Sequence, residues 1–381
     1  MQSRWTALSL RRVVFSNRFI PEVDGFRFIA ILVVAISHIY AQCGPFPAGG
    51  VFEQVFHRAF VDGKRGVYLF FTISGFILAL PFARHHLEQG KPVRLLSYFR
   101  RRLTRLEPPY VIVMCLRALA LFVVGRDVGR VGLHLMASIF YVHNLLYNHF
   151  SIINPPAWSL EIEIQFYLLA PLFTAIFMVR PKALRRVLLV AITLGSGLAA
   201  ELFITPDTRA SLSLLAFFQY FVAGFLLCDL YLSGDRPPLP KWCWDVLGVL
   251  ALVWIFYSQW HWYQVALPFA TLVLYLAGFY GSLVRAFFSL RAISIIGGMC
   301  YSLYLTHTIV LTAFTPIVHR LVHSALPAFV MYPLLIALPL AGVLLVGSMF
   351  FVLVERPCMN PEWPHKLALK LGLSPRDRLA R

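Results

Sequence analysis

Long apolar runs, separated by short polar loops, alternate along almost the whole chain. A helix that crosses a membrane needs about 20 mostly apolar residues in succession. Ten runs approach or reach that length: Phe26–Tyr40, Gly66–Ala83, Tyr110–Val124, Trp158–Val179, Val187–Ile204, Ser211–Leu232, Cys243–Tyr257, Val265–Val284, Ile293–Phe314 and Met331–Val354. An eleventh run, Leu133–Tyr147, is short and partly polar, so we expect a re-entrant or interfacial segment there. The pattern predicts an all-α integral membrane protein with about ten transmembrane helices.

The composition of the chain excludes an ordinary soluble domain. Apolar residues make up 59% of its 381 residues and charged residues 13%, and its mean hydropathy is +0.73. Soluble domains carry roughly 45–50% apolar and about 25% charged residues. A soluble fold of this size needs more charged residues than this to cover its surface. The composition therefore indicates that the protein lies in a lipid bilayer.

The net charge of +17 fits a membrane protein better than a nucleic-acid-binding protein. Basic surfaces bind nucleic acid, but basic loops also orient membrane helices. With ten spans and an internal N-terminus, the inside segments hold 25 Lys and Arg residues and the outside segments hold 7. This asymmetry predicts that both termini are cytoplasmic and that the protein spans the cell membrane, the inner one in a Gram-negative cell. No nucleic-acid partner is expected.

The chain has the organisation of a single membrane domain. We expect a basic cytoplasmic segment over residues 1–18, the membrane domain over 19–355 and a basic cytoplasmic tail over 356–381. The basic start followed by an apolar run is superficially like a secretory signal, but Arg27 and His38 interrupt that run, so a retained first helix is the better interpretation. The 6 cysteines include no CxxC pair, so we expect neither a metal site nor a disulfide framework.

Four ionisable residues stand out inside the predicted spans: Arg27 and His38 in the first, Glu163 in the fourth and His307 in the ninth. Burying such a group costs at least about 2.5–3.5 kcal/mol on insertion scales, so each is a candidate functional residue. The spacing of Arg27 and His38 places them on one helical face, about 16 Å apart along the axis. By itself His38 is as easily a packing histidine, but an arginine on the same face favours a polar interior.

The segment before the third span carries a dense group of arginines, among them Arg101, Arg102 and Arg105. Guanidinium groups at this position can anchor the chain against anionic lipid headgroups. They can equally hold phosphate groups of a ligand, because arginine offers paired donors in a fixed geometry. Charge alone does not decide between these two interpretations.

Two further polar positions lie in the second and fourth spans. Ser74, followed by Gly75, invites comparison with the nucleophile elbow of hydrolases, but that motif needs a strand–turn–helix context. A helix-packing contact is therefore the favoured interpretation. In the fourth span Trp158 suits the membrane interface, and Glu163 lies more than one turn further in, where it needs a partner or a neutral state.

Taken together, these segments resemble the membrane acyltransferase family 3, whose multi-pass members O-acylate surface carbohydrates and some secondary metabolites. The motifs that carry the resemblance are Asp24-Gly25-x-Arg27 with His38 following, Phe70-Phe71-x-x-Ser74-Gly75-Phe76, Arg101-Arg102-x-x-Arg105-x-x-Pro108-x-Tyr110, Trp158-Ser159-Leu160-x-x-Glu163-x-x-Phe166-Tyr167, Tyr301-Ser302-x-Tyr304-Leu305-x-His307 and Glu355-Arg356-Pro357. Each motif is weak by itself. Their order, spacing and position on the predicted spans make the set specific.

The resemblance implies transfer of an acyl group, most commonly acetyl, from cytoplasmic acyl-CoA to a hydroxyl of a carbohydrate such as a lipopolysaccharide or another surface glycan. His38 would be the general base or a transient acyl carrier, and Glu163 would orient it. The CoA phosphates would be held by Arg27, Arg101, Arg102 and Arg105. Supporting or substrate-lining positions would be Asp24, Ser74, Tyr110, Trp158, Tyr167 and His307. No metal and no permanently bound cofactor are expected.

Two other functions compete with this one. A transporter of an acyl donor or a lipid-linked glycan would use the buried histidine, arginine and glutamate as a relay, but no internal repeat relates the halves of the chain. A purely structural scaffold leaves Arg27, His38 and Glu163 without a purpose. Some family members carry an extracytoplasmic hydrolase-like domain; we expect none here, and a separate extracytoplasmic partner is then an option. The acceptor, the acyl group and the oligomeric state are not readable from the sequence.

Overall fold

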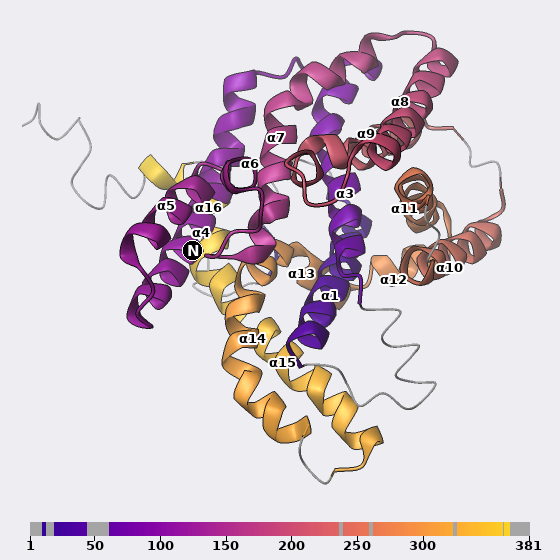
Figure 1. Cartoon of the computed structure of the whole chain (residues 1–381). Helices are drawn as coiled ribbons and strands as arrows, with labels where there is room; N and C mark the ends of the chain where they lie inside the picture. Colours follow the sequence, from indigo (N-terminus) through magenta and orange to yellow (C-terminus); the bar gives the residue numbers. More distant parts are fainter. Residues whose placement is uncertain are drawn as a thin grey trace, which may run out of the picture.

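The computed structural model describes residues 10–12, 19–43, 61–235, 239–258, 262–322, 326–360 and 362–365. Every regular element within these residues is helical (Figure 1). The longer helices are α1 (Pro21–Cys43), α3 (Lys64–Leu87), α4 (Leu95–Val123), α7 (Trp158–Phe173), α8 (Lys182–Phe203), α9 (Phe218–Leu232), α10 (Lys241–Tyr257), α11 (Tyr263–Tyr280), α14 (Cys300–Val322) and α15 (Ala328–Phe350). The shorter ones are α5 (Val128–Ile139), α6 (His143–Tyr147), α12 (Leu283–Phe288), α13 (Arg291–Gly298) and α16 (Arg356–Cys358).

The helix lengths confirm an all-α integral membrane protein. Within the described residues, 8 helical stretches are long and apolar enough to cross a membrane. The two other predicted spans are also helices, but α9 has 15 residues and α10 has 17. Each of the ten predicted runs therefore contains a helix, and the structure supports eight of them as full-length spans.

Several helix starts differ from the sequence prediction; the sixth span was placed from Ser211, for example, yet α9 begins at Phe218. The third predicted span was placed from Tyr110 onward, yet α4 begins at Leu95 and carries the arginine-rich segment as part of the helix. The ninth was placed from Ile293, yet α14 begins at Cys300, after the separate short helix α13, which ends in Gly297 and Gly298. The start of α4 is helical but polar, and the apolar run of α14 begins before the helix does, so hydropathy alone locates neither start.

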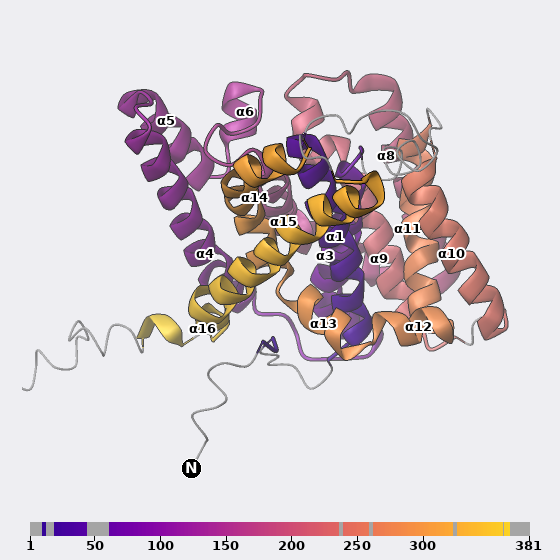
Figure 2. The same ribbon diagram turned by 90° about the horizontal axis from the view of Figure 1, so that it is seen from below.

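The eleventh apolar run forms two short helices, α5 and α6, and not a span. A break at Tyr141, whose φ is +55°, separates them. Figure 2 shows α5 and α6 at one edge of the bundle and α12, α13 and α16 along the opposite edge. This arrangement agrees with the predicted re-entrant or interfacial segment, because neither helix is long enough to cross a membrane.

Close backbone contact between α3 and α9 forms the centre of the bundle. A side chain added at Gly75 would meet the backbone of Phe221, and one added at Gly224 would meet the carbonyl of Thr72. Small residues let membrane helices approach this closely. The expected packing role therefore holds for Gly75, whereas its neighbour Ser74 has a hydrogen-bond partner described below.

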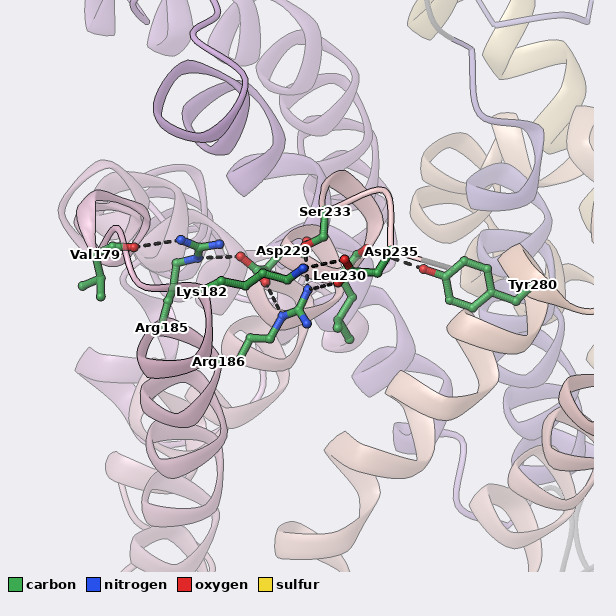
Figure 3. A network of polar contacts seen from close by, with 9 residues as sticks. All are labelled: Val179, Lys182, Arg185, Arg186, Asp229, Leu230, Ser233, Asp235 and Tyr280. Carbon is green, nitrogen blue, oxygen red and sulfur yellow. Dashed lines mark hydrogen bonds and ion pairs between the residues drawn. The ribbon is translucent and has the colours of Figure 1, made fainter. Parts of the chain in front are cut away.

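A buried ion-pair network joins α8 to α9 (Figure 3). The carboxylate of Asp229, which is fully buried, accepts hydrogen bonds from Arg185 at 2.5 Å and from Arg186 at 2.8 Å. Arg186 also reaches Asp235 at 2.9 Å, and Lys182 reaches the same carboxylate at 2.5 Å. Of these basic residues, which the sequence places in a cytoplasmic loop, Arg185 and Arg186 pair with a buried carboxylate, whereas the pair between Lys182 and Asp235 is exposed.

The two described ends of the chain lie on the same side of the bundle. Arg12 and Met359 line one cavity together with Arg105 of α4. The indole N–H of Trp363 donates to the carbonyl of Thr104 at 2.8 Å. Both ends thus lie beside the arginine-rich start of α4, and the cytoplasmic location of that side stays a prediction. Residues 1–9, 13–18 and 366–381 of the predicted terminal segments lie outside the described residues.

Candidate active site

A cavity of about 400 Å³ opens between α1, α3, α4, α7 and α14. Its lining brings together side chains that are far apart in the sequence: Arg12, Arg27, Phe70, Ser74, Tyr98, Arg101, Arg102, Arg105, Tyr141, Ser159, Glu163, Tyr167, Tyr301 and Tyr304. All four arginines predicted to hold a donor are in this set. A concave site of this size, lined by apolar side chains and a set of polar ones, is typical of a small-molecule site.

The cavity is strongly basic, because five arginines line it and Glu163 is its single lining carboxylate among the described residues. Arg27 donates to Asp24 at 2.6 Å, and Arg105 lies 3.5 Å from Glu355. The Nε atom of Arg105 is buried without a hydrogen-bond partner. Several cationic groups gathered around unfilled space form a site for an anion.

Arg12 is the member of this group that the sequence analysis did not select. Its Nη1 lies 3.2 Å from Asp24, and its Nε is buried without a partner. Burial, together with the neighbouring charges of Arg105 and Arg27, lowers the pKa of Arg12 to about 9. A bound anion would reduce the repulsion between these guanidinium groups. The site therefore favours a negatively charged ligand.

The first turns of α4 explain why its arginines face one way. Tyr98, Arg102 and Arg105 follow at spacings of four and three residues, which places them on one helical stripe. The guanidinium of Arg102 lies over two rings, 4.8 Å from the centroid of Tyr167 and 5.4 Å from that of Tyr98. This stacking fixes the plane of the guanidinium toward the cavity. The same spacing in the sequence would have placed Tyr98 beside Arg102 and Arg105, but Tyr98 was not among the predicted site residues.

Glu163 organises the polar wall of the cavity. Its Oε1 accepts a hydrogen bond from Ser74 of α3 at 2.5 Å and a second from the hydroxyl of Tyr167, one turn further along α7. Sequence reasoning expected Glu163 to orient His38. The hydrogen bonds of Glu163 instead join α3 to α7 and connect, through Tyr167, to Arg102. Ser74 is accordingly a cavity residue with a carboxylate partner.

His38 of α1 contacts His307 of α14. The two rings are stacked, with centroids 4.9 Å apart, and Nδ1 of His38 lies 3.3 Å from Nε2 of His307. On its other side, Nδ1 of His307 lies 2.6 Å from the carbonyl oxygen of Tyr304. A carbonyl only accepts, so Nδ1 of neutral His307 carries the proton and its Nε2 accepts one from His38. His38 then keeps a bare Nε2, the form that a general base needs.

The two histidines lie beyond the inner end of the arginine-lined cavity. Neither ring lines it, whereas Tyr304, whose carbonyl holds His307, does. The hydroxyl of Tyr304 bonds Ser159 at 2.8 Å and donates to the carbonyl of Pro156. Tyr304 is therefore a contact between the cavity lining and the histidine pair, with its ring centroid 5.7 Å from that of His307. Its motif was recognised in the sequence, but only His307 was selected from it.

Several predicted supporting residues lie outside the cavity. Tyr110 is fully buried and donates to the carbonyl of Ser138 at 2.9 Å. Trp158 packs among aromatic rings, including Phe71 and Phe217. Asp24 contacts the site through Arg27 and Arg12. These residues position the walls and do not line the cavity themselves.

No group of three or more potential metal ligands occurs among the residues that the structure describes. His134 and His143 form a second histidine pair, with Nδ1 of the first 2.7 Å from Nε2 of the second. It lies on α5 and α6, at the opposite edge from α13 and α16 (Figure 2). The burial of these rings and their mutual repulsion lower the pKa of His143 to about 4.

Comparison with known proteins identifies relatives over most of the chain. A family model described as an acyltransferase domain, that of acyltransferase 3, matches residues 20–351. The O-acetyltransferase OatA of Staphylococcus aureus (strain NCTC 8325 / PS 47) is 29% identical over 324 residues, which cover 77% of this chain and 51% of the relative. A putative O-acetyltransferase, SACOL0978 of Staphylococcus aureus (strain COL), is 26% identical over 329 residues, with the same coverage. The chain thus spans about half the length of these curated relatives. No solved structure matches it.

Proposed function

Because this chain belongs to the acyltransferase 3 family, we propose that it transfers an acyl group, most simply acetyl, from acyl-CoA to a hydroxyl of a carbohydrate acceptor at the cell surface. The names of the relatives support an oxygen acceptor and an acetyl group. The donor enters from the side that carries both described chain ends, which the excess of basic residues predicts to be cytoplasmic.

The observation that carries this proposal is the arginine-lined cavity next to the histidine pair. Acyl-CoA has a polyanionic nucleotide end and a long, mostly neutral arm that ends in the thioester. The cavity lining combines the same two characters, five arginines together with neutral and aromatic residues such as Ser159, Phe70 and Tyr304. Along α1, Arg27 and His38 lie about 16 Å apart, a distance that such an arm can bridge.

The histidine pair supplies the proton chemistry of the proposed reaction. Nε2 of His38 accepts the proton of the acceptor hydroxyl while that oxygen attacks the thioester carbonyl. The carbon–sulfur bond then breaks, the acyl group stays on the acceptor oxygen, and the CoA sulfur leaves and takes up a proton. Transfer through His38 itself, with an acyl-imidazole between the two steps, uses the same atoms in two stages.

The test is acyl transfer by the purified protein in detergent, followed as release of the CoA thiol and as label from acetyl-CoA on a soluble glycan acceptor. We expect His38→Ala to abolish both signals at matched amounts of folded protein. Normal turnover in His38→Ala would move the base elsewhere. A wild-type protein that binds acetyl-CoA but never releases thiol would favour the transporter alternative.

A further inference from the structure

A second cavity, of about 390 Å³, lies beside the first and takes no part in the chemistry proposed above. Its polar lining includes Arg11, Arg12, Asp24, Arg291 and Ser294, and Phe19 adds an aromatic ring. These residues come from the N-terminal segment, the start of α1 and the start of α13. All of them belong to the edge of the bundle that also carries α12 and α16 (Figure 2).

The two cavities are connected through shared side chains. Arg12 lines both of them. Asp24, in the lining of the second cavity, accepts hydrogen bonds from Arg12 at 3.2 Å and from Arg27 at 2.6 Å, and Arg27 lines the first. A ligand that fills one cavity therefore lies within reach of the other, on either side of this Asp24 pairing.

The second cavity has an excess of positive charge of its own. Three arginines line it, and its one acidic residue, Asp24, already bonds two guanidinium groups. Nε of Arg12 is buried and has no hydrogen-bond partner. Phe19, which lines the same cavity, is 53% exposed and adds an aromatic side chain to it. Guanidinium groups beside an open aromatic ring suit a phosphorylated nucleoside.

We propose that the second cavity binds the 3′-phosphorylated adenosine end of the acyl-CoA donor, while the first holds its diphosphate and its pantetheine arm. The assignment rests on the proposed function, because it names a subsite for the same donor. CoA carries two separate anionic groups, and the structure offers two adjoining basic cavities. The 3′-phosphate is a monoester with a charge of about −1.5 to −2 at neutral pH, which Arg291 and Arg11 match. The adenine stacks on Phe19.

The experiment compares CoA with dephospho-CoA, which lacks only the 3′-phosphate. Dissociation constants for both are measured on the purified full-length protein in detergent, for the wild type, Arg291→Ala and the control Arg285→Ala. Arg285 is a matched control because it lies at the same edge, lines neither cavity and pairs with Glu22 at 2.9 Å. Its removal takes one positive charge from the same side without touching the proposed subsite.

We expect the wild type and Arg285→Ala to bind CoA about tenfold or more tightly than dephospho-CoA, as charged hydrogen bonds require. In Arg291→Ala this preference should fall to about twofold or less, because the affinity for CoA decreases while the affinity for dephospho-CoA does not. Unchanged binding of dephospho-CoA then shows that the variant is folded. Phe19→Ala should weaken both nucleotides equally and leave pantetheine binding unchanged.

Three results would contradict the proposed subsite. The first is a wild-type protein that binds CoA and dephospho-CoA equally tightly. This result would leave the proposed function intact, because CoA still binds. Equal weakening of both nucleotides in Arg291→Ala would show that Arg291 does not contact the 3′-phosphate. Loss of co-purified phosphatidylglycerol in Arg291→Ala, with an unchanged nucleotide preference, would assign the cavity to a lipid phosphate. Failure of the proposed function has a different signature: no binding of either nucleotide and no acyl transfer.

Discussion

The Nδ1 atom of His38 lies 3.3 Å from Nε2 of His307, and Nδ1 of His307 lies 2.6 Å from a backbone carbonyl. When both rings are neutral, this chain of contacts fixes one tautomer in each and leaves Nε2 of His38 without a proton. In the proposed function, where His38 is the base, His307 takes the place usually given to a carboxylate behind a catalytic histidine. The carbonyl accepts from Nδ1 and so fixes the orientation of the second ring.

The first prediction concerns His307 as a positioning residue. We expect His307→Leu to lower turnover at least about tenfold, because the tautomer and orientation of His38 are lost, while His307→Gln restores much of the rate. The Gln amide can accept from His38 and donate to Tyr304. Rates are measured per folded protein. The matched control is His143→Gln in the other histidine pair, which should stay close to the wild-type rate. Equal losses in the Leu and Gln variants would contradict the tautomer argument.

The second prediction concerns Arg102. Its guanidinium stacks on Tyr98 and Tyr167, and lysine reproduces neither the flat face nor the paired donors. Arg102→Lys should therefore weaken CoA binding by about tenfold while expression and membrane insertion stay normal. Arg94→Lys is the control, since Arg94 lies at the start of α4 and does not line the cavity. Unchanged affinity in Arg102→Lys would return the arginine group to lipid anchoring.

The third prediction separates geometry from charge at Glu163. Gln can still accept the hydroxyl hydrogen bonds of Ser74 and Tyr167 through its amide oxygen, whereas Ala leaves both hydroxyls unpaired. We expect Glu163→Ala to weaken CoA binding about tenfold and Glu163→Gln to keep it within about twofold. If Glu163→Gln binds CoA normally but turns over slowly, the negative charge itself takes part in the reaction.

The fourth prediction concerns stability. Asp229 is fully buried and pairs with Arg185 and Arg186 (Figure 3). Asp229→Ala removes the carboxylate that pairs with the buried guanidinium of Arg185, so the free energy of unfolding should fall by about 3–5 kcal/mol. Denaturant unfolding in detergent measures the loss. Asp235→Asn is the comparison: this carboxylate is exposed, its pairs are screened by water, and its replacement should change stability little.

The fifth prediction concerns topology. If the 25-to-7 distribution of basic residues orients the chain, a cysteine placed at Arg101 and one at the C-terminal Arg381 should react only after the membrane is permeabilised. A cysteine at Arg130 on α5 should react in intact cells, because α5 lies at the opposite edge of the bundle (Figure 2). Labelling of position 381 from outside would contradict the cytoplasmic assignment of both ends.

The sequence by itself determined the membrane class, the helical content and the family motifs. Long apolar runs indicate a membrane environment directly, because a segment that crosses the bilayer as a helix must be long and apolar. Periodicity also placed Arg27 and His38 on one face, because both lie on the same helix and helical geometry is fixed. The arginines at the start of α4 were selectable for the same reason: their chemistry and spacing are local.

Only the tertiary structure decided which side chains meet. Glu163 was expected beside His38, yet it bonds Ser74 and Tyr167, and the ring against His38 comes from α14, far away in sequence. Likewise Arg12, which precedes α1 in the sequence, lines the cavity and pairs with Asp24 of α1. Such pairings depend on how helices pack and rotate against one another, and no local pattern encodes that rotation. The sequence supplied the chemical groups, and the packing of α1, α3, α4, α7 and α14 made them a site.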